Sequence, residues 1–100
     1  MEMNIQRDGK VLTVTPVGRI DTLTAPEFQK QLEEELGDAN ELIIDFSQGT
    51  YVSSAGLRVL LILLQEMENR NGDMKLIHVS QIVRDVFEVT GLLEDLTIID

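Results

Sequence analysis

Two adjacent serines, Ser53 and Ser54, are the residues of this chain whose type and position could support chemistry. They stand where a short strand-like run ending at Val52 gives way to a strongly apolar helix. The first turn of a helix has unpaired backbone amides, which bind either the side-chain oxygen of a cap or the oxygens of a phosphate. A serine at this junction is therefore a helix cap or a phosphate acceptor, and the residues alone leave both interpretations open.

The residues that follow the serines bear on both interpretations. Ala55 and Gly56 leave little side chain around the hydroxyls, so another backbone or a large enzyme could approach closely. Glycine in a first turn costs roughly 0.5–1 kcal/mol relative to alanine. Arg58 lies one turn beyond Ser54 and could pair with an anion there or with an acidic neighbour. A phosphate on Ser54 would add about −1.5 to −2 charges where amides and helix dipole favour anions, so the fold would accept it.

Two aspartates are further candidates near the junction. Asp45 lies near the carboxyl end of a central strand, the edge where α/β folds usually place their sites. Asp21 lies in the loop ahead of the first helix. A loop aspartate most often caps a turn or a helix. If both instead point toward Ser54, they orient its hydroxyl and make the local surface acidic.

The sequence carries no recognisable catalytic machinery. It has no G-x-S-x-G elbow and no Walker-type phosphate loop, and its one histidine, His78, falls in a predicted strand where we expect a structural role. Without cysteine, thiol chemistry and disulfides are excluded, and one histidine cannot form a histidine-rich metal site. We therefore expect no enzyme activity, no metal and no cofactor.

Length and charge describe one small domain. One hundred residues with 43% hydrophobic content support a single core. A net charge of −10 repels nucleic acid and anionic lipid, and it suits either a partner with a basic face or a plain soluble protein. The longest apolar run, Val59 to Leu64, is too short to span a membrane, and no signal peptide is visible. We expect a cytoplasmic protein.

Hydrophobic periodicity predicts alternating strands and helices. Two extended runs flank an Asp8-Gly9 hairpin turn, and Pro16 places the second strand at an edge or ends it. Thr24 to Glu27 reads as a capping box for a helix that ends at Gly37. That helix carries one apolar stripe, formed by Ala25, Phe28, Leu32 and Leu36.

The remaining elements complete an α/β pattern. They are a strand at 42–46 buried on both faces, a helix at about 55–69, a strand at 74–79, a helix capped by Ser80 that stops at Gly91, and a strand at 96–99. Residues 18–23 read as a loop. This order calls for an α/β sandwich, with a mixed central sheet and crossover helices packed on it.

The second helix is apolar on more sides than a helix covering one sheet face requires. A helical wheel puts Leu57, Leu60, Leu61 and Leu64 on one stripe, with Met67 at its margin, and we expect this stripe to pack on the sheet. Val59, Ile62 and Leu63 fall on roughly the opposite side. Either another helix of the domain covers them or they form a contact surface for another chain.

Four segments in order resemble the STAS domain family, named for sulfate transporters and anti-sigma factor antagonists. They are Gly18-x-Ile20-Asp21-x-x-Thr24-Ala25, Leu42 to Ser47, Tyr51 to Leu57, and Ser80-x-x-Val83-x-x-Val86-Phe87-x-x-Thr90-Gly91-Leu92. Each is weak alone, but all four at this spacing are fairly specific. The resemblance implies a single STAS-like domain over residues 1–100.

The resemblance also implies a bacterial partner-switching protein. In such families the unmodified antagonist binds an anti-sigma factor that is also a serine kinase, which frees the sigma factor. Phosphorylation by the kinase releases the antagonist, and a metal-dependent serine phosphatase restores it. By position the phosphoacceptor is Ser54, which can be both cap and acceptor, with Ser53 as the alternative.

The same resemblance implies a partner-binding surface and a simple assembly. The implied partner-binding residues are Asp21, Thr22, Ser53, Ser54, Ala55, Gly56, Leu57, Arg58, Val59 and Ile62. No direct contact with nucleic acid or membrane is implied, and we expect a monomer or a weak dimer.

Two departures from the family pattern stand out. Many members have aspartate immediately before the acceptor, where this chain has Ser53. Many also continue beyond the position of Asp100 into a final helix, so we expect that helix to be absent or trimmed, which could expose one side of the sheet.

Two other functions stay open. One is a scaffold or transport-associated STAS module that binds a partner through the same helix without phosphorylation. The other is binding of a small ligand or nucleotide at the carboxyl edge of the sheet.

Overall fold

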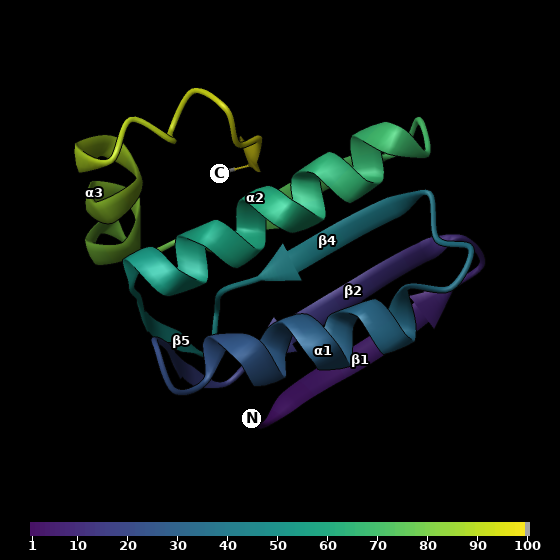
Figure 1. Ribbon diagram of the computed structural model, residues 1–100, viewed down its shortest axis with the longest axis horizontal. Coiled ribbons are helices and arrows are strands. Elements are labelled where there is room, and N and C mark those ends of the chain that lie inside the picture. The colour runs from purple at the N-terminus through teal and green to yellow at the C-terminus, as the bar shows by residue number, and fades with distance from the viewer. Residues whose placement is uncertain (100) are drawn as a thin grey trace.

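A computed structural model describes residues 1–99, which form a mixed sheet covered by helices (Figure 1). Its strands are β1 (Met3–Asp8), β2 (Val11–Pro16), β3 (Gly18–Ile20), β4 (Glu41–Asp45), β5 (Gly49–Val52), β6 (Asp73–Ile77) and β7 (Ile98–Ile99). Its helices are α1 (Ala25–Leu36), α2 (Ser54–Asn69) and α3 (Gln81–Val89). The predicted α/β class with crossover helices is confirmed. Asp100 lies outside the described residues.

Within residues 1–99, the main sheet has the strand order β1-β2-β4-β6-β7. The β1–β2 hairpin is antiparallel and turns at Gly9 and Lys10, one residue after the predicted Asp8-Gly9 turn, and the other pairs are parallel. Pro16 ends β2, which confirms one of the two predicted alternatives, and the other alternative, an edge strand, does not hold because β2 lies between β1 and β4. A proline at the last residue of a strand leaves the inner part of the hydrogen-bond ladder intact.

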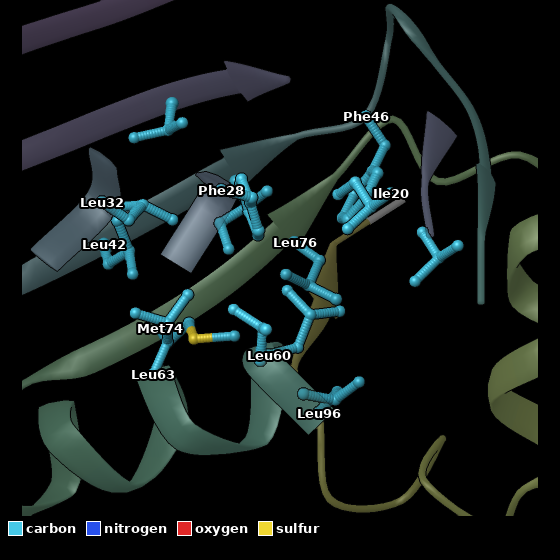
Figure 2. Packing of buried hydrophobic residues seen from close by; sticks show 14 of the residues in the cluster. Ile20, Phe28, Leu32, Leu42, Phe46, Leu60, Leu63, Met74, Leu76 and Leu96 are labelled. Carbon is cyan, nitrogen blue, oxygen red and sulfur yellow. The ribbon is translucent and has the colours of Figure 1, made fainter. Parts of the chain in front are cut away.

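The helical face of the main sheet carries the core, which Figure 2 shows from close by. Alternate residues of the three inner strands are buried on this face: Leu12, Val14, Leu42, Ile44, Met74 and Leu76. The prediction that the central strand is buried on both faces is wrong, since Glu41, Ile43 and Asp45 of β4 are only half-buried. The reason is that α1 and α2 contact each other on the same side of the sheet.

The rotation of α2 about its axis also differs from the prediction. Val59 and Leu63, expected on the outer side, are buried, whereas Leu61 and Leu64 are only half-buried. Because α2 packs against both β6 and α1, its buried arc is set by two neighbours and not by the sheet alone. Cover by another helix of the domain, one of the two alternatives, is therefore confirmed for Val59 and Leu63. Ile62 stays 42% exposed.

Two arginines from distant elements fix the carboxyl end of α1. Arg7 of β1 donates to the carbonyl oxygens of Glu35 and Leu36, at 2.5 and 3.3 Å. Arg70, which follows α2, donates to the carbonyl oxygens of Gly37 and Ala39, at 2.8 and 3.1 Å. The bonds to Glu35, Leu36 and Gly37 satisfy carbonyls that a helix end leaves unpaired, and the bond to Ala39 holds the loop that follows. Together they tie the end of α1 to β1 and to the end of α2.

The segment expected to be a loop at residues 18–23 contains a short strand. β3 pairs in parallel with β5, and the Ser53 amide continues the contact by donating to the Ile20 carbonyl oxygen at 2.8 Å. Gly56 in the first turn of α2 is buried against these two strands. A Cβ there would lie 2.8 Å from Val52 Cγ1 and 2.9 Å from the Ile20 carbonyl oxygen. The backbone that packs closely against Gly56 therefore belongs to this chain and not to a partner.

We predict that Gly56→Ala lowers the free energy of unfolding by about 1–3 kcal/mol, because the added methyl group overpacks a site bounded by backbone. Urea unfolding measures the change. Glu68→Ala, at an exposed position of the same helix, is the control and should stay within about 0.5 kcal/mol of wild type. Equal stability of Gly56→Ala and wild type would show that the close approach does not constrain the fold.

Candidate functional site

The pairing of β3 with β5 brings the starts of two helices together. Ile20 and Val52 are register partners at the carboxyl ends of these strands. The next residues along each strand, Asp21 and Ser53, lead into α1 and α2. Figure 1 shows both helices beginning at the same end of the molecule, beside α3. This end carries most of the residues that the sequence singled out.

The two serines have different roles in the structure. Ser53 is the N-cap of α2, with φ −87° and ψ 177°, and its hydroxyl accepts a hydrogen bond from the Gly56 amide at 3.4 Å. Ser54 is the first residue of the helix and is exposed. Within residues 1–99 its side chain makes no hydrogen bond with the protein. The prediction that Ser54 also caps the helix is therefore wrong, because its neighbour does so.

Asp21 caps the turn that leads into α1. Its Oδ1 accepts hydrogen bonds from the amides of Leu23 and Thr24, at 3.0 and 3.1 Å. In return, Thr24 Oγ1 accepts from the Asp21 amide at 2.9 Å, so the two residues form a reciprocal capping box. The predicted box at Thr24 to Glu27 is wrong by three residues. Glu27 instead pairs with the amino group of Met1 at 2.7 Å.

Hydrogen bonds from its neighbours stabilise the negative charge of Asp21. Its pKa lies below its usual range, chiefly because the Thr24 amide donates to it, with further lowering by Leu23, Thr24 Oγ1 and Arg19. Arg19 lies 3.6 Å from Asp21 Oδ2 and stacks over the ring of Tyr51 at 4.8 Å. The sequence did not reveal this Arg19–Tyr51 contact, because it depends on the pairing of β3 with β5.

The side chain of Asp45, at the carboxyl end of β4, is already engaged in hydrogen bonds. Its Oδ1 lies 2.8 Å from His78 Nδ1 and accepts from the Ser47 amide at 2.8 Å. Burial raises the pKa of Asp45, but the hydrogen bonds from His78 and Ser47 outweigh that effect and hold the pKa below its usual range. His78 itself follows β6 with φ 56° and is exposed, so its predicted place in a strand is wrong.

Neither aspartate hydrogen-bonds to Ser54, and the alternative in which they orient its hydroxyl is therefore not what the structure shows. The commoner role, capping a turn, is confirmed for Asp21. Arg58 is exposed one turn beyond Ser54 and forms no ion pair within residues 1–99, so its charge is available at this surface.

The predicted partner-binding residues differ in how exposed they are. Thr22, Ser54, Arg58 and Ile62 are exposed, and Asp21, Ser53 and Ala55 are half-buried. Gly56, Leu57 and Val59 are buried beneath these residues. Leu23, which no sequence pattern singles out, is 87% exposed in the Asp21 turn. No helix within residues 1–99 has the length and apolar character to cross a membrane.

The STAS domain family matches residues 2–100. The chain belongs to this family. An anti-sigma-B factor antagonist of Listeria monocytogenes is 30% identical over 88 residues, which cover 87% of this chain and 77% of that protein.

Solved structures agree on the fold of this STAS domain. The anti-sigma factor antagonist SpoIIAA in its unphosphorylated form has a TM-score of 0.83 at 19% identity, covering 99% of this chain and 89% of that one. The phosphorylated form of the Bacillus cell fate determinant SpoIIAA has a TM-score of 0.75 at 18% identity, covering 99% and 92%.

These relatives place the STAS domain among the anti-sigma factor antagonists. Anti-sigma factor antagonists are non-enzymatic regulators, which bears out the expectation that the protein is not an enzyme.

The division of roles between the serines predicts different effects on stability. Ser53→Ala should lower the free energy of unfolding by about 0.5–2 kcal/mol, because it removes the N-cap of α2. Ser54→Ala should change it by less than about 0.5 kcal/mol, because an exposed hydroxyl is lost. Chemical denaturation of both variants measures the difference, and a larger loss for Ser54→Ala would contradict the assignment of the cap.

The lowered pKa of Asp45 predicts a loss of stability in acid. Since its pKa in the folded protein lies below the ordinary value of 3.8, the stabilisation is complete above that value and disappears as the pH falls through the folded-state pKa. Wild type should therefore lose more stability than Asp45→Asn between about pH 6 and about pH 3. Urea unfolding at a series of pH values measures this, and parallel pH profiles would contradict it.

Proposed function

We propose that this STAS domain is a cytoplasmic, phosphorylation-controlled anti-sigma factor antagonist whose phosphoacceptor is Ser54. The observation that supports it best is the division of labour at the start of α2. Ser53 provides the cap, so the hydroxyl of Ser54 is exposed and free of bonds to the protein. A kinase can phosphorylate this hydroxyl without breaking a contact that stabilises the fold.

The position of Ser54 also suits the product of the reaction. The first turn of a helix has free amides and the positive end of the helix dipole, both of which stabilise a phosphate. The guanidinium of Arg58 lies one turn further along the same exposed side of α2. The Ser53 cap is a neighbouring side chain and can stay in place. Phosphorylation therefore changes the surface while leaving the fold intact.

The exposed residues around Ser54 give the partner its contact surface. Thr22 and Leu23 project from the Asp21 turn, and Arg58 continues the surface along α2. An anti-sigma factor that is also a serine kinase docks here while Ser54 is unmodified. About −1.5 to −2 added charges then repel or sterically block it, and a serine phosphatase restores binding. The solved phosphorylated form of SpoIIAA, a protein of the same fold, supports this cycle.

Phosphorylation is testable on protein isolated from its native host, by intact-mass spectrometry and site mapping. We expect a population heavier by one phosphate, mapped to Ser54, with none in Ser54→Ala and unchanged occupancy in Ser53→Ala. A phosphate on Ser53 that persists in Ser54→Ala would overturn the assignment.

Release is testable with the kinase that modifies the wild-type protein. Ser54→Asp should weaken kinase binding by at least about tenfold, which corresponds to about 1.4 kcal/mol, while circular dichroism shows an unchanged fold. Ser54→Ala should bind like wild type. If Ser54→Asp also bound with wild-type affinity, the domain would be a phosphorylation-independent scaffold instead.

A further inference from the structure

A groove separates the carboxyl-terminal halves of α1 and α2, and nothing in the proposed phosphorylation cycle uses it. Its volume is about 620 Å³, within the range of binding sites for ligands and peptide side chains. We call it the α1–α2 groove and define it by Glu33, Glu34 and Leu36 on one side and Ile62, Leu63 and Glu66 on the other. Its floor is apolar, because Leu36 and Leu63 lie beneath it.

Ile62 is the groove's exposed anchor point. At 42% exposure it is a large aliphatic side chain that no other element of the described chain covers fully. It lies beside Leu63, so a side chain of a partner that packs on Ile62 would extend an existing apolar surface. Burying exposed apolar surface is favourable by roughly 25 cal/mol for each Å² removed from water.

The rim of the groove is negatively charged. Glu33 and Glu34 make no ion pair within residues 1–99. Of the two nearby cations, Arg70 is already engaged, since it pairs with Glu66 at 2.8 Å and donates to the carbonyl oxygens of Gly37 and Ala39. Lys30, one turn before Glu33 and Glu34 on α1, forms no ion pair with either of them. The rim of the groove is therefore net negative above an apolar floor, on a chain whose net charge is −10.

We propose that the α1–α2 groove binds a basic amphipathic helix of a partner protein. The apolar side of such a helix would pack on Ile62 and the floor, and lysine or arginine side chains beside that stripe would face Glu33 and Glu34. An amphipathic helix laid into a groove between two helices is a common mode of peptide recognition, and charge complementarity selects the basic form over the acidic one.

This docking is separate from the reaction at Ser54. Ile62 lies eight residues along α2 from Ser54, or about 12 Å at 1.5 Å per residue. That separation exceeds a Debye length of about 8 Å at physiological salt, so a phosphate on Ser54 would be largely screened at the groove. The groove therefore holds its helix in both phosphorylation states, and this inference does not depend on the proposed function.

The test uses a synthetic 18-residue helical peptide of leucine and lysine, titrated into the full-length ¹⁵N-labelled protein. A second peptide has every lysine replaced by glutamate. We expect the lysine peptide to shift the amide signals of the second halves of α1 and α2, and the glutamate peptide to bind at least about tenfold more weakly. Ser54→Asp should bind the lysine peptide as wild type does.

Matched variants separate groove binding from general attraction to an acidic protein. Ile62→Ser and the double change Glu33→Lys with Glu34→Lys should each weaken binding by roughly fivefold to tenfold. Ile82→Ser, at a 64% exposed isoleucine of α3, should leave it unchanged. Signal shifts spread over the whole surface, or equal loss in Ile62→Ser and Ile82→Ser, would overturn the proposal whatever the outcome at Ser54.

Discussion

The parallel pairing of β3 with β5 is the constraint on which the rest of the site depends. It places Ile20 and Val52 side by side, so the two helices that follow must begin next to each other. The first turn of α2 can approach this pair only because Gly56 has no Cβ. The cost of glycine in a helix is thereby offset by the packing that it permits. With Asp21 and Ser53 both engaged as caps, Ser54 is left free at the surface.

Elements with strong and local signals could be predicted from the sequence. The apolar stripe of α1 is buried as expected, and Ser80 caps α3, where its hydroxyl accepts from the Val83 amide at 3.3 Å. β3 was missed because three residues carry no periodic pattern of their own, and its strand geometry comes from pairing with a segment 31 or more residues away in sequence. The prediction of which side of α2 is buried was wrong for a related reason, since α1 as well as the sheet determines which residues of α2 are buried.

The candidate site shows the same limit. The sequence could identify the Ser53–Ser54 junction and the aspartates, because their residue types suit caps and acceptors. It could not divide the roles between the serines. That division depends on which of the two serines is the last residue before the helix, and only the backbone angles show this. Leu23, the Arg19–Tyr51 contact and the His78–Asp45 pair were also beyond it. Each depends on where a turn or a distant strand is placed, and no local pattern encodes that.

The placement of Ser54 restricts how a phosphate on it could act. At the amino end of a helix the added negative charge is stabilised by the backbone amides and the helix dipole, so it does not favour a rearranged fold. The cap, the glycine contact and the β3–β5 pair lie behind Ser54 and do not involve its hydroxyl. A switch built on this residue therefore works by exclusion at the surface, where charge and bulk oppose a partner that must cover Ser54. If the α1–α2 groove binds its helix as proposed, one helix presents a switchable contact at its start and a constant one along its second half.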